Sequence, residues 1–346
     1  MTIDQAGNIY TANPASNNVS KITPAGVSTI IGTTGSSPSA ITIDKQGNIY
    51  TANYDSNNVS KITPAGVSTI LGTTGSEPSA IAIDSQGNIY TANSNSNSSN
   101  VSKITPAGTS TILATTGTNP STNPISIIID SQDNIYTANN GSNNVSKITP
   151  AGVSTIIGTT GLSPYAITMD SQGNIYTANY GANNVSKITP AGVSTILATT
   201  GYNPIAMTID QAGNIYTANS GSYNVSKITP AGVSTIIGTT GVSPSAITID
   251  NQGNIYTANS MTYNISKIRK ITEVVNVTAL SAGTTTITAI TEDGSFTATT
   301  SVTVTNPIIP VQSISLSTSS LSLLTGATST IIATISPASS TNKSIT

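Results

Sequence analysis

Short apolar runs separated by polar turns recur along this chain. In the second of these repeats the apolar runs are Ala40–Asp44, Asn48–Asn53, Val59–Thr63 and Val67–Gly72. All four are rich in Ile, Val, Ala or Thr, and the segments between them contain Gly, Pro or Asn. Short β-branched runs bounded by such residues are typical of β-strands joined by turns. The pattern therefore predicts four strands in each repeat and no helix.

The repeat is marked by the motif Asp-x-x-Gly-Asn-Ile-Tyr-Thr-Ala-Asn, which occurs seven times. Asp133 replaces the glycine in the fourth copy. The seven copies begin at Asp4, Asp44, Asp84, Asp130, Asp170, Asp210 and Asp250. Four antiparallel strands in about 40 residues form the blade of a β-propeller. We therefore predict an all-β chain in which residues 1–272 form a propeller of seven blades, with six blades as the alternative.

The seventh copy loses the pattern after Ile268. The first copy begins directly at its first strand, so no strand precedes it that could complete the last blade. We expect residues 273–278 to serve as the outer strand of that blade. We also expect the sequence to be a fragment of a longer protein, because it opens inside a repeat without a signal peptide.

The segment after the propeller reads as strands of a β-sandwich. The order of its strand segments resembles that of the bacterial immunoglobulin-like domain, group 2. The segments that carry this resemblance are Ala282–Ala289, Val302–Val304, Val311–Leu316 and Ala333–Ala338. The resemblance implies that residues 273–306 are the C-terminal half of one such domain and residues 307–346 the N-terminal half of the next. In that family these domains are spacers and adhesive modules of surface proteins.

Composition narrows the chemistry. The 346 residues include no Cys, His or Trp, only 7% are charged, and the net charge is −2. The absence of Cys rules out disulfides and thiolate chemistry, and the absence of His removes the commonest general base. The absence of a basic patch argues against nucleic acid, and no apolar run is long enough to cross a membrane. A surface of Asn, Ser, Thr and Gly favours a secreted or cell-surface location.

The propeller segment also carries a family resemblance. The stretch Gly47–Asn53 followed by Asn57–Gly66 looks like the NHL-type propeller repeat and is similar to the surface-layer YVTN repeat. This resemblance implies the propeller fold over residues 1 to 270 and leaves function open, because such propellers serve unrelated roles.

The charged residues give no obvious catalytic set. One Asp and one Lys recur in every repeat, which favours a structural role for both. The Lys positions are Lys21, Lys61, Lys103, Lys147, Lys187, Lys227 and Lys267. Ten charged residues lie outside the repeat, among them Lys45, Asp55, Glu77 and Asp133, and no two form an evident acid–base pair or ligand set. We predict no catalytic residues, no metal and no cofactor.

Aromatic residues outside the repeat indicate a binding surface. Six of the thirteen tyrosines depart from the repeat, and all lie in the two loops that follow the second and fourth strands, which open on one face of a propeller. Exposed aromatic and apolar residues gathered on one rim suit a protein or glycan partner. Neutral variation in loops would give the same pattern. The predicted binding residues are Tyr54, Leu162, Tyr165, Tyr180, Tyr202, Tyr223, Met261 and Tyr263.

These observations predict a non-enzymatic binding or scaffold module at the cell surface. The first alternative is an enzyme of the propeller lyase or lactonase type. The lyases in question depend on His in their family, and this sequence contains none. A lactonase of the gluconolactonase type needs a central acidic metal site, and in this sequence only the repeated Asp could supply it. The second alternative is a purely structural surface-layer component.

Overall fold

The computed structural model describes residues 1–116 and 122–269 and, towards the C-terminus, residues 282–290, 297–305, 312–317, 328–330, 332–336 and 339. The chain divides into two units, Met1–Ile271 and Thr272–Thr346. In the described residues no helix is long and apolar enough to cross a lipid bilayer. The predicted outer strand at residues 273–278 lies outside the described residues.

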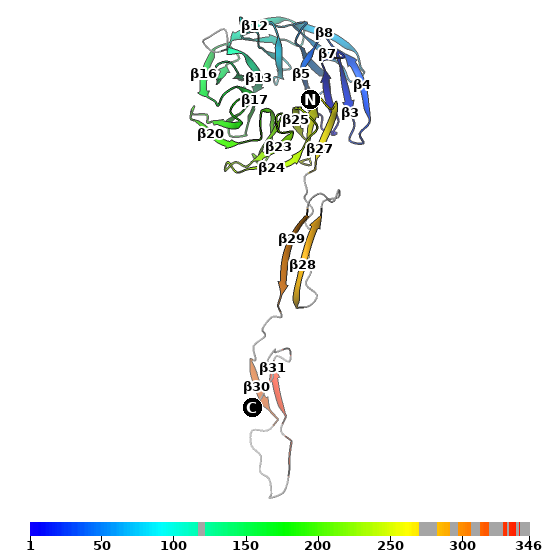
Figure 1. The fold of residues 1–346 in the computed structure, drawn as a ribbon, viewed down its shortest axis with the longest axis vertical. Helices are drawn as coiled ribbons and strands as arrows, with labels where there is room; N and C mark the ends of the chain where they lie inside the picture. Colours follow the sequence, from blue (N-terminus) through cyan, green and yellow to red (C-terminus); the bar gives the residue numbers. More distant parts are fainter. Residues whose placement is uncertain are drawn as a thin grey trace. The chain divides into compact units, whose positions relative to one another are not determined.

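The first unit is a ring of seven antiparallel sheets, and the prediction of a seven-bladed propeller is confirmed (Figure 1). Blade 1 comprises β1 (Thr2–Ile3), β2 (Ile9–Asn13), β3 (Asn18–Ile22) and β4 (Ser28–Thr33). Blade 2 comprises β5 (Pro38–Ile43), β6 (Ile49–Asn53), β7 (Asn58–Ile62) and β8 (Ser68–Thr73). Blade 3 comprises β9 (Pro78–Ile83), β10 (Ile89–Asn93), β11 (Asn100–Ile104) and β12 (Ser110–Thr115). Blade 4 comprises β13 (Pro124–Ile129), β14 (Ile135–Asn139), β15 (Asn144–Ile148) and β16 (Ser154–Thr159). Blade 5 comprises β17 (Pro164–Met169), β18 (Ile175–Asn179), β19 (Asn184–Ile188) and β20 (Ser194–Thr199). Blade 6 comprises β21 (Pro204–Ile209), β22 (Ile215–Asn219), β23 (Asn224–Ile228) and β24 (Ser234–Thr239). In the described residues, blade 7 comprises β25 (Pro244–Ile249), β26 (Ile255–Asn259) and β27 (Asn264–Ile268).

Within each blade the strands follow one another from the hub to the rim. Figure 1 shows the first strands, such as β5, β13 and β17, nearest the centre of the ring and the fourth strands, such as β4 and β16, at its edge. β1 contacts β25, so blades 7 and 1 meet without a covalent link within the described residues. Since all pairings are antiparallel, the connections after strands two and four open at one end of the ring, called here the loop face. The turns after strands one and three open at the opposite end, the turn face.

Apolar contacts between neighbouring blades form the core. In blades 2 to 6 the second strand is buried along its whole length, which is why its sequence shows no polar alternation. Between blades 2 and 3, Tyr50 and Val59 pack with Ile89 and Ile104. Corresponding clusters hold the other neighbouring pairs from blade 1 to blade 7. Apolar contacts of Ile, Val and Tyr between neighbouring sheets are therefore what stabilises the ring.

A polar network runs through each blade beside this core. The fully buried Asn53 donates from its side-chain amide to Asn58 Oδ1 at 2.7 Å and to Ser60 Oγ at 2.8 Å. The Gly35 N–H of the preceding connection donates to the same Ser60 hydroxyl at 3.0 Å. Buried polar atoms need such partners, since an unpaired one is costly. This gives the recurring Asn-Val-Ser triplet a structural cause.

The second unit contains two strand pairs in its described residues. β28 (Gly283–Ile290) pairs with β29 (Thr297–Val304), and β30 (Ser313–Leu316) pairs with β31 (Ala333–Ser336), both antiparallel. The assignment of these segments to immunoglobulin-like halves stays a prediction.

Candidate active site

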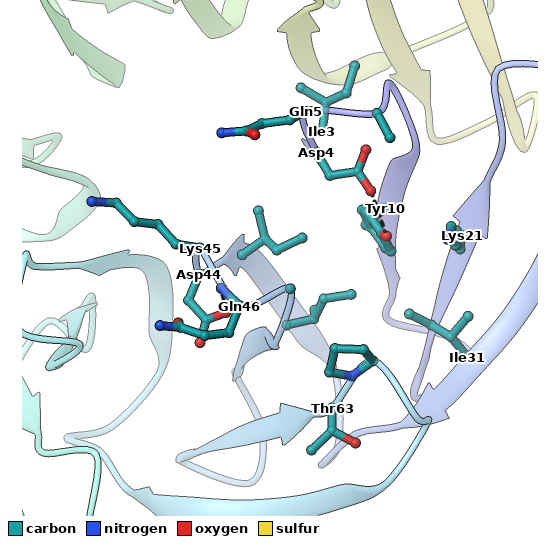
Figure 2. A pocket seen from close by; sticks show the side chains of 15 residues that line it. Ile3, Asp4, Gln5, Tyr10, Lys21, Ile31, Asp44, Lys45, Gln46 and Thr63 are labelled. Atoms are coloured by element: carbon teal, nitrogen blue, oxygen red, sulfur yellow. Dashed lines mark hydrogen bonds between the residues drawn. The ribbon is translucent and has the colours of Figure 1, made fainter.

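The repeated Asp residues on the turn face are hydrogen-bonded in place. Asp44 accepts from the Asn48 N–H at 2.7 Å, from the Asn48 side-chain amide at 2.8 Å and from the Tyr50 hydroxyl at 3.0 Å. The other six copies repeat these bonds, as at Asp4 (Figure 2). The repeated Lys stands over the ring of the repeated Tyr, with Lys61 Nζ 5.7 Å from the ring centroid of Tyr50. A carboxylate engaged by three donors is a turn element, as the sequence predicts.

Two pockets lie on the turn face between these Asp turns. One, of about 650 Å³, lies between blades 1 and 2, and the other, of about 600 Å³, between blades 2 and 3. Both are lined by Asp44, Lys45 and Gln46, and Figure 2 shows the Lys45 side chain extending away from the turn into the open space. Asp133, on the same face, accepts a hydrogen bond from the Ser85 hydroxyl at 3.2 Å. The described turn-face carboxylates are thus all hydrogen-bonded, and the departures from the repeat on this face include Lys45 and Asp133.

The predicted binding residues all belong to the loop face. Tyr165 lies on strand β17, as its second residue, and the other seven lie in the loops. Tyr263 is 91% exposed and Tyr202 68%, whereas Tyr54 and Tyr180 are half-buried. The remaining four are exposed, namely Leu162, Tyr165, Tyr223 and Met261.

Tyr54 and Glu77 form the first polar contact of a cluster on the loop face. Burial raises the pKa of Tyr54, and its hydrogen bond to the Glu77 carboxylate and the nearby Asp55 charge raise this pKa further. Tyr54 belongs to blade 2, yet the Tyr165 phenol of blade 5 also acts on it electrostatically. The Tyr165 ring in turn packs against Tyr180, with centroids 5.3 Å apart and planes tilted by 42°. Tyr54 of blade 2 and Tyr165 of blade 5 therefore lie within electrostatic range of each other on the loop face.

The backbone around Glu77 is held from several directions. Its N–H donates to Asn57 Oδ1 at 2.8 Å, and its carbonyl oxygen accepts from the Ser94 N–H at 2.9 Å. Its side chain accepts from the Asn95 amide at 3.1 Å. Glu77 has a φ of 59°, a left-handed conformation that long side chains rarely adopt. The equivalent positions with such a φ in other blades hold Ser or Asn, so a carboxylate here is specific to the connection between blades 2 and 3.

Asp55 supplies a second carboxylate beside this one. It accepts a hydrogen bond from the Ser37 hydroxyl, which anchors it to the connection between blades 1 and 2. The sequence places Asp55 and Glu77 in the same two loops as the tyrosines, but it does not reveal that Tyr54 joins them. The one feature of the sequence that could have pointed to these two residues is that both are acidic departures from the repeat within these loops.

The arrangement can perform acid–base chemistry. It combines an ionisable carboxylate, a phenol with a raised pKa hydrogen-bonded to that carboxylate, and an aromatic pair nearby. Proton donors and acceptors held side by side in this way are what general acid–base catalysis requires. No group of three or more Asp, Glu, His or Cys that could hold a metal occurs in the part of the chain that the structure describes.

The fold defines the chain as a seven-bladed β-propeller. Residues 1–271 match the model of the virginiamycin B lyase family, and the chain belongs to this family. No curated protein matches the sequence.

Solved structures with the same fold support the architecture. Virginiamycin B lyase from Staphylococcus aureus superimposes with a TM-score of 0.69 at 19% identity, covering 77% of this chain and 92% of that one. A catalytically inactive histidine-to-alanine variant of the same lyase, solved with quinupristin, gives a TM-score of 0.68 at 20% identity, with 77% and 92% covered. A gluconolactonase from Xanthomonas campestris gives 0.50 at 13% identity, with 62% and 80% covered.

Family membership corrects two of the expectations from sequence. The prediction of a non-enzymatic scaffold is wrong, as is the prediction that the chain is not an enzyme, because its propeller belongs to a family of lyases. The lyase alternative is the better one. The expectation failed because it took the absence of His as evidence against catalysis, although carboxylates and phenols also serve as general bases and acids. The family that matches is also neither the NHL nor the YVTN repeat.

Proposed function

We propose that this chain is a lyase whose acid–base residues lie in the loop-face cluster, with Glu77 as general base and Tyr54 as general acid. The family supports the reaction class. The observation that carries the residue assignment is Glu77, a carboxylate that occurs in one connection of the ring and stands near enough to the half-buried Tyr54 to raise the pKa of its phenol.

The chemistry of a lyase needs a base and an acid but no water. The Glu77 carboxylate takes a proton from a carbon of the substrate. The electron pair of that C–H bond forms a carbon–carbon double bond, and the adjacent bond to the leaving group breaks. Tyr54, which like other tyrosines carries its proton at neutral pH, gives that proton to the leaving atom. The substrate divides or opens without gaining an atom.

Histidine cannot take part in this chain. A relative becomes inactive when one histidine is replaced by alanine, whereas the present sequence has no histidine at all. The proton must therefore be taken by another group, and Glu77 and Asp55 are the loop-face carboxylates beside a phenol. Because the base differs, the substrate is tested over a panel that begins with virginiamycin B and quinupristin, the compounds named for the family and for this relative.

Aromatic side chains next to the cluster supply the binding surface. Tyr165 and Tyr180 form a tilted pair on the loop face, and Tyr202, Tyr223 and Tyr263 are exposed on the same face. Rigid aromatic groups bind apolar and ring-containing ligands at low entropic cost. The glycan or protein partner, the secreted or cell-surface location and the immunoglobulin-like halves stay predictions.

The test is an assay of the full chain with product analysis by mass spectrometry. A lyase gives products whose masses sum to that of the substrate, whereas a hydrolase adds one water. Glu77→Gln removes the base while keeping its shape and should lower kcat about 100-fold or more, the usual contribution of a general base. Tyr54→Phe should lower kcat without abolishing folding.

A matched control lies on the opposite face. Asp133→Gly removes a non-repeat carboxylate and restores the repeat sequence, so it should leave kcat unchanged. Equal loss in Asp133→Gly and Glu77→Gln would contradict the assignment, and products heavier by one water would contradict the lyase.

A further inference from the structure

The innermost strand of each blade from 2 to 7 carries a β-bulge at its second residue. In β5 the register shifts between Pro38 and Ala40, so Ser39 has no partner on β6. The same irregularity occurs in β9, β13, β17, β21 and β25. A bulge turns its side chain out of the ladder, and these six side chains lie where the innermost strands reach the loop face. They are called here the hub residues: Ser39, Ser79, Ile125, Tyr165, Ile205 and Ser245.

The hub residues divide into a polar side and an apolar side. Ser39 donates from its hydroxyl to the Pro78 carbonyl oxygen of blade 3 at 2.6 Å, and Ser79 makes the same bond to Pro124 of blade 4 at 3.1 Å. Isoleucine cannot form this bond. Nevertheless, the three consecutive blades 4 to 6 carry the apolar hub residues, which are partly or largely exposed: Ile125, Tyr165 and Ile205. Exposed apolar side chains grouped in this way are typical of a surface that binds a ligand.

The loops beside blade 5 extend the apolar side. Tyr165 packs against Tyr180 with ring centroids 5.3 Å apart. Leu162 is exposed and lies close to Gly181, since a Cβ added to this glycine would be 3.0 Å from Leu162 Cγ. The apolar side therefore offers both aromatic and aliphatic contacts.

The two loop-face carboxylates lie on the other side, at blades 2 and 3. Glu77 directly precedes Pro78, the first residue of the innermost strand β9, and Asp55 lies in the loop after β6. Burial raises the pKa of Tyr54, and the Glu77 and Asp55 charges and the Tyr165 phenol raise it further. Both carboxylates and the apolar side are therefore within electrostatic range of Tyr54.

The loop face has no cation to balance these carboxylates. In the sequence, the connections that open on this face within residues 1–269 contain two charged residues, Asp55 and Glu77. The repeated Lys is the fourth residue of each third strand, towards the turn face, and Lys45 lies in a turn on that face. The negative charge of the loop face therefore attracts a cation.

We propose that the substrate of this lyase is an organic cation that carries an apolar ring system, and that Asp55 is the residue that selects it. The protonated amine lies against Asp55, which the Ser37 hydroxyl holds in place, and the ring system lies on Tyr165 and its apolar neighbours. Glu77 is then left to act as the base. A positive charge near the C–H bond also stabilises the negative charge that develops on carbon. This inference rests on the proposed function, because it concerns the same site.

The experiment measures binding to the full chain without turnover, by ligand-observed NMR. The compounds are benzyltrimethylammonium, which has both a charge and a ring, benzyl alcohol, which has the ring alone, and tetramethylammonium, which has the charge alone. We expect benzyltrimethylammonium to bind about tenfold more tightly than either of the others, because it uses both sides of the site. Raising the salt concentration should weaken the binding of the two cations and leave benzyl alcohol unchanged.

Three variants assign the two parts of the ligand to their residues. Asp55→Asn should weaken benzyltrimethylammonium about fivefold and leave benzyl alcohol unchanged. Tyr165→Ser introduces the hub residue of blades 2, 3 and 7, so it should weaken both ring compounds and leave tetramethylammonium unchanged. Asp133→Gly, on the turn face, should change none of the three.

The outcomes separate this inference from the proposed reaction. Equal binding of benzyltrimethylammonium and benzyl alcohol, or an unchanged affinity in Asp55→Asn, would overturn the cationic substrate. If elimination depends on Glu77 while neither cation binds, this inference alone is wrong. If the cations bind as expected and no compound of the substrate panel is eliminated, the proposed reaction is wrong and the loop face is a binding site for such cations.

Discussion

Tyr223 and Tyr263 occupy a backbone position that other blades give to asparagine. Asn17, Asn57, Asn143 and Asn183 have φ values of 51° to 54°, and the two tyrosines share this left-handed conformation at 53° and 52°. Asparagine tolerates it, whereas a bulky side chain is strained there. The asparagine also accepts a hydrogen bond from the next connection, as Asn183 does from the Asn203 N–H at 2.7 Å. Strain of this kind tends to persist where function requires it.

Replacing Tyr223 with Asn should therefore stabilise the propeller. The change relieves the left-handed strain and supplies an acceptor for the Ser243 N–H, which together should add about 1–2 kcal/mol to the free energy of unfolding. Urea denaturation measures the gain, and Asn183→Tyr, the reverse change in blade 5, should cost a similar amount. A loss of stability in Tyr223→Asn would show that the tyrosine ring makes contacts that outweigh its strain. Substrate affinity should fall in the same variant if Tyr223 contributes to binding.

At the scale of the element, the Asp turn links each first strand to its second through ionisable groups. Burial raises the pKa of Tyr10 to about 12, and its hydrogen bond to Asp4 adds to this. The pKa values of five other repeat tyrosines, Tyr50, Tyr90, Tyr136, Tyr176 and Tyr216, are also raised. For Asp4, burial alone would raise the pKa, but hydrogen bonds from Asn8 and Tyr10 outweigh it and hold the pKa below 3.8.

These shifts give the stability a defined dependence on pH. A folded tyrosine keeps its proton above pH 10 while the unfolded one loses it, so this stabilisation is complete below pH 10 and declines as pH rises towards 12 and above. A folded Asp stays ionised below pH 3.8, so its contribution declines as pH falls through that value. We expect the urea midpoint to be flat near neutrality and to drop on both sides. Tyr10→Phe should make the alkaline drop smaller, and a midpoint constant from pH 10 to 12 would contradict the role of the phenols.

The Asp turn also shows what could be predicted from the sequence and what could not. The period predicts the strands, a ring of seven or six blades and the structural role of Asp44, since these depend on contacts repeated about every 40 residues. The contact of Tyr54 with Glu77 and its proximity to Tyr165 could not be found in this way. Tyr54 and Tyr165 are far apart in sequence, and only the closed ring brings them within electrostatic range of each other. The proposed site consists of residues that depart from the repeat, and the periodicity of the sequence cannot predict how such residues are arranged.

At the scale of the whole molecule, stability is distributed as a ring of similar interfaces. Six pairs of neighbouring blades share an apolar cluster of one Tyr, Val and two or more Ile, with few charges to oppose their contact. The junction of blades 7 and 1 is the exception among the described residues, because Ile22 of blade 1 and Ile265 of blade 7 are half-buried, whereas their counterparts Ile62 and Val225 are fully buried. In arrays of similar units, opening begins where the interface between neighbours is weakest.

The ring should therefore open at the junction of blades 7 and 1 before it unfolds elsewhere. Native-state hydrogen exchange measures this directly, because amides exposed by local opening exchange at a lower free energy than those released only by global unfolding. We expect the amides of β2 and β27 to exchange faster than those of β10 and β18, which lie in blades with complete neighbours on both sides and are buried throughout. Ile104→Ala, at the closed interface between blades 2 and 3, should cost about 2–5 kcal/mol, whereas Ile22→Ala should cost less because its side chain is already partly exposed. Equal hydrogen-exchange protection around the ring, together with equal losses of unfolding free energy for the two substitutions, would mean that the junction of blades 7 and 1 is as stable as the other six.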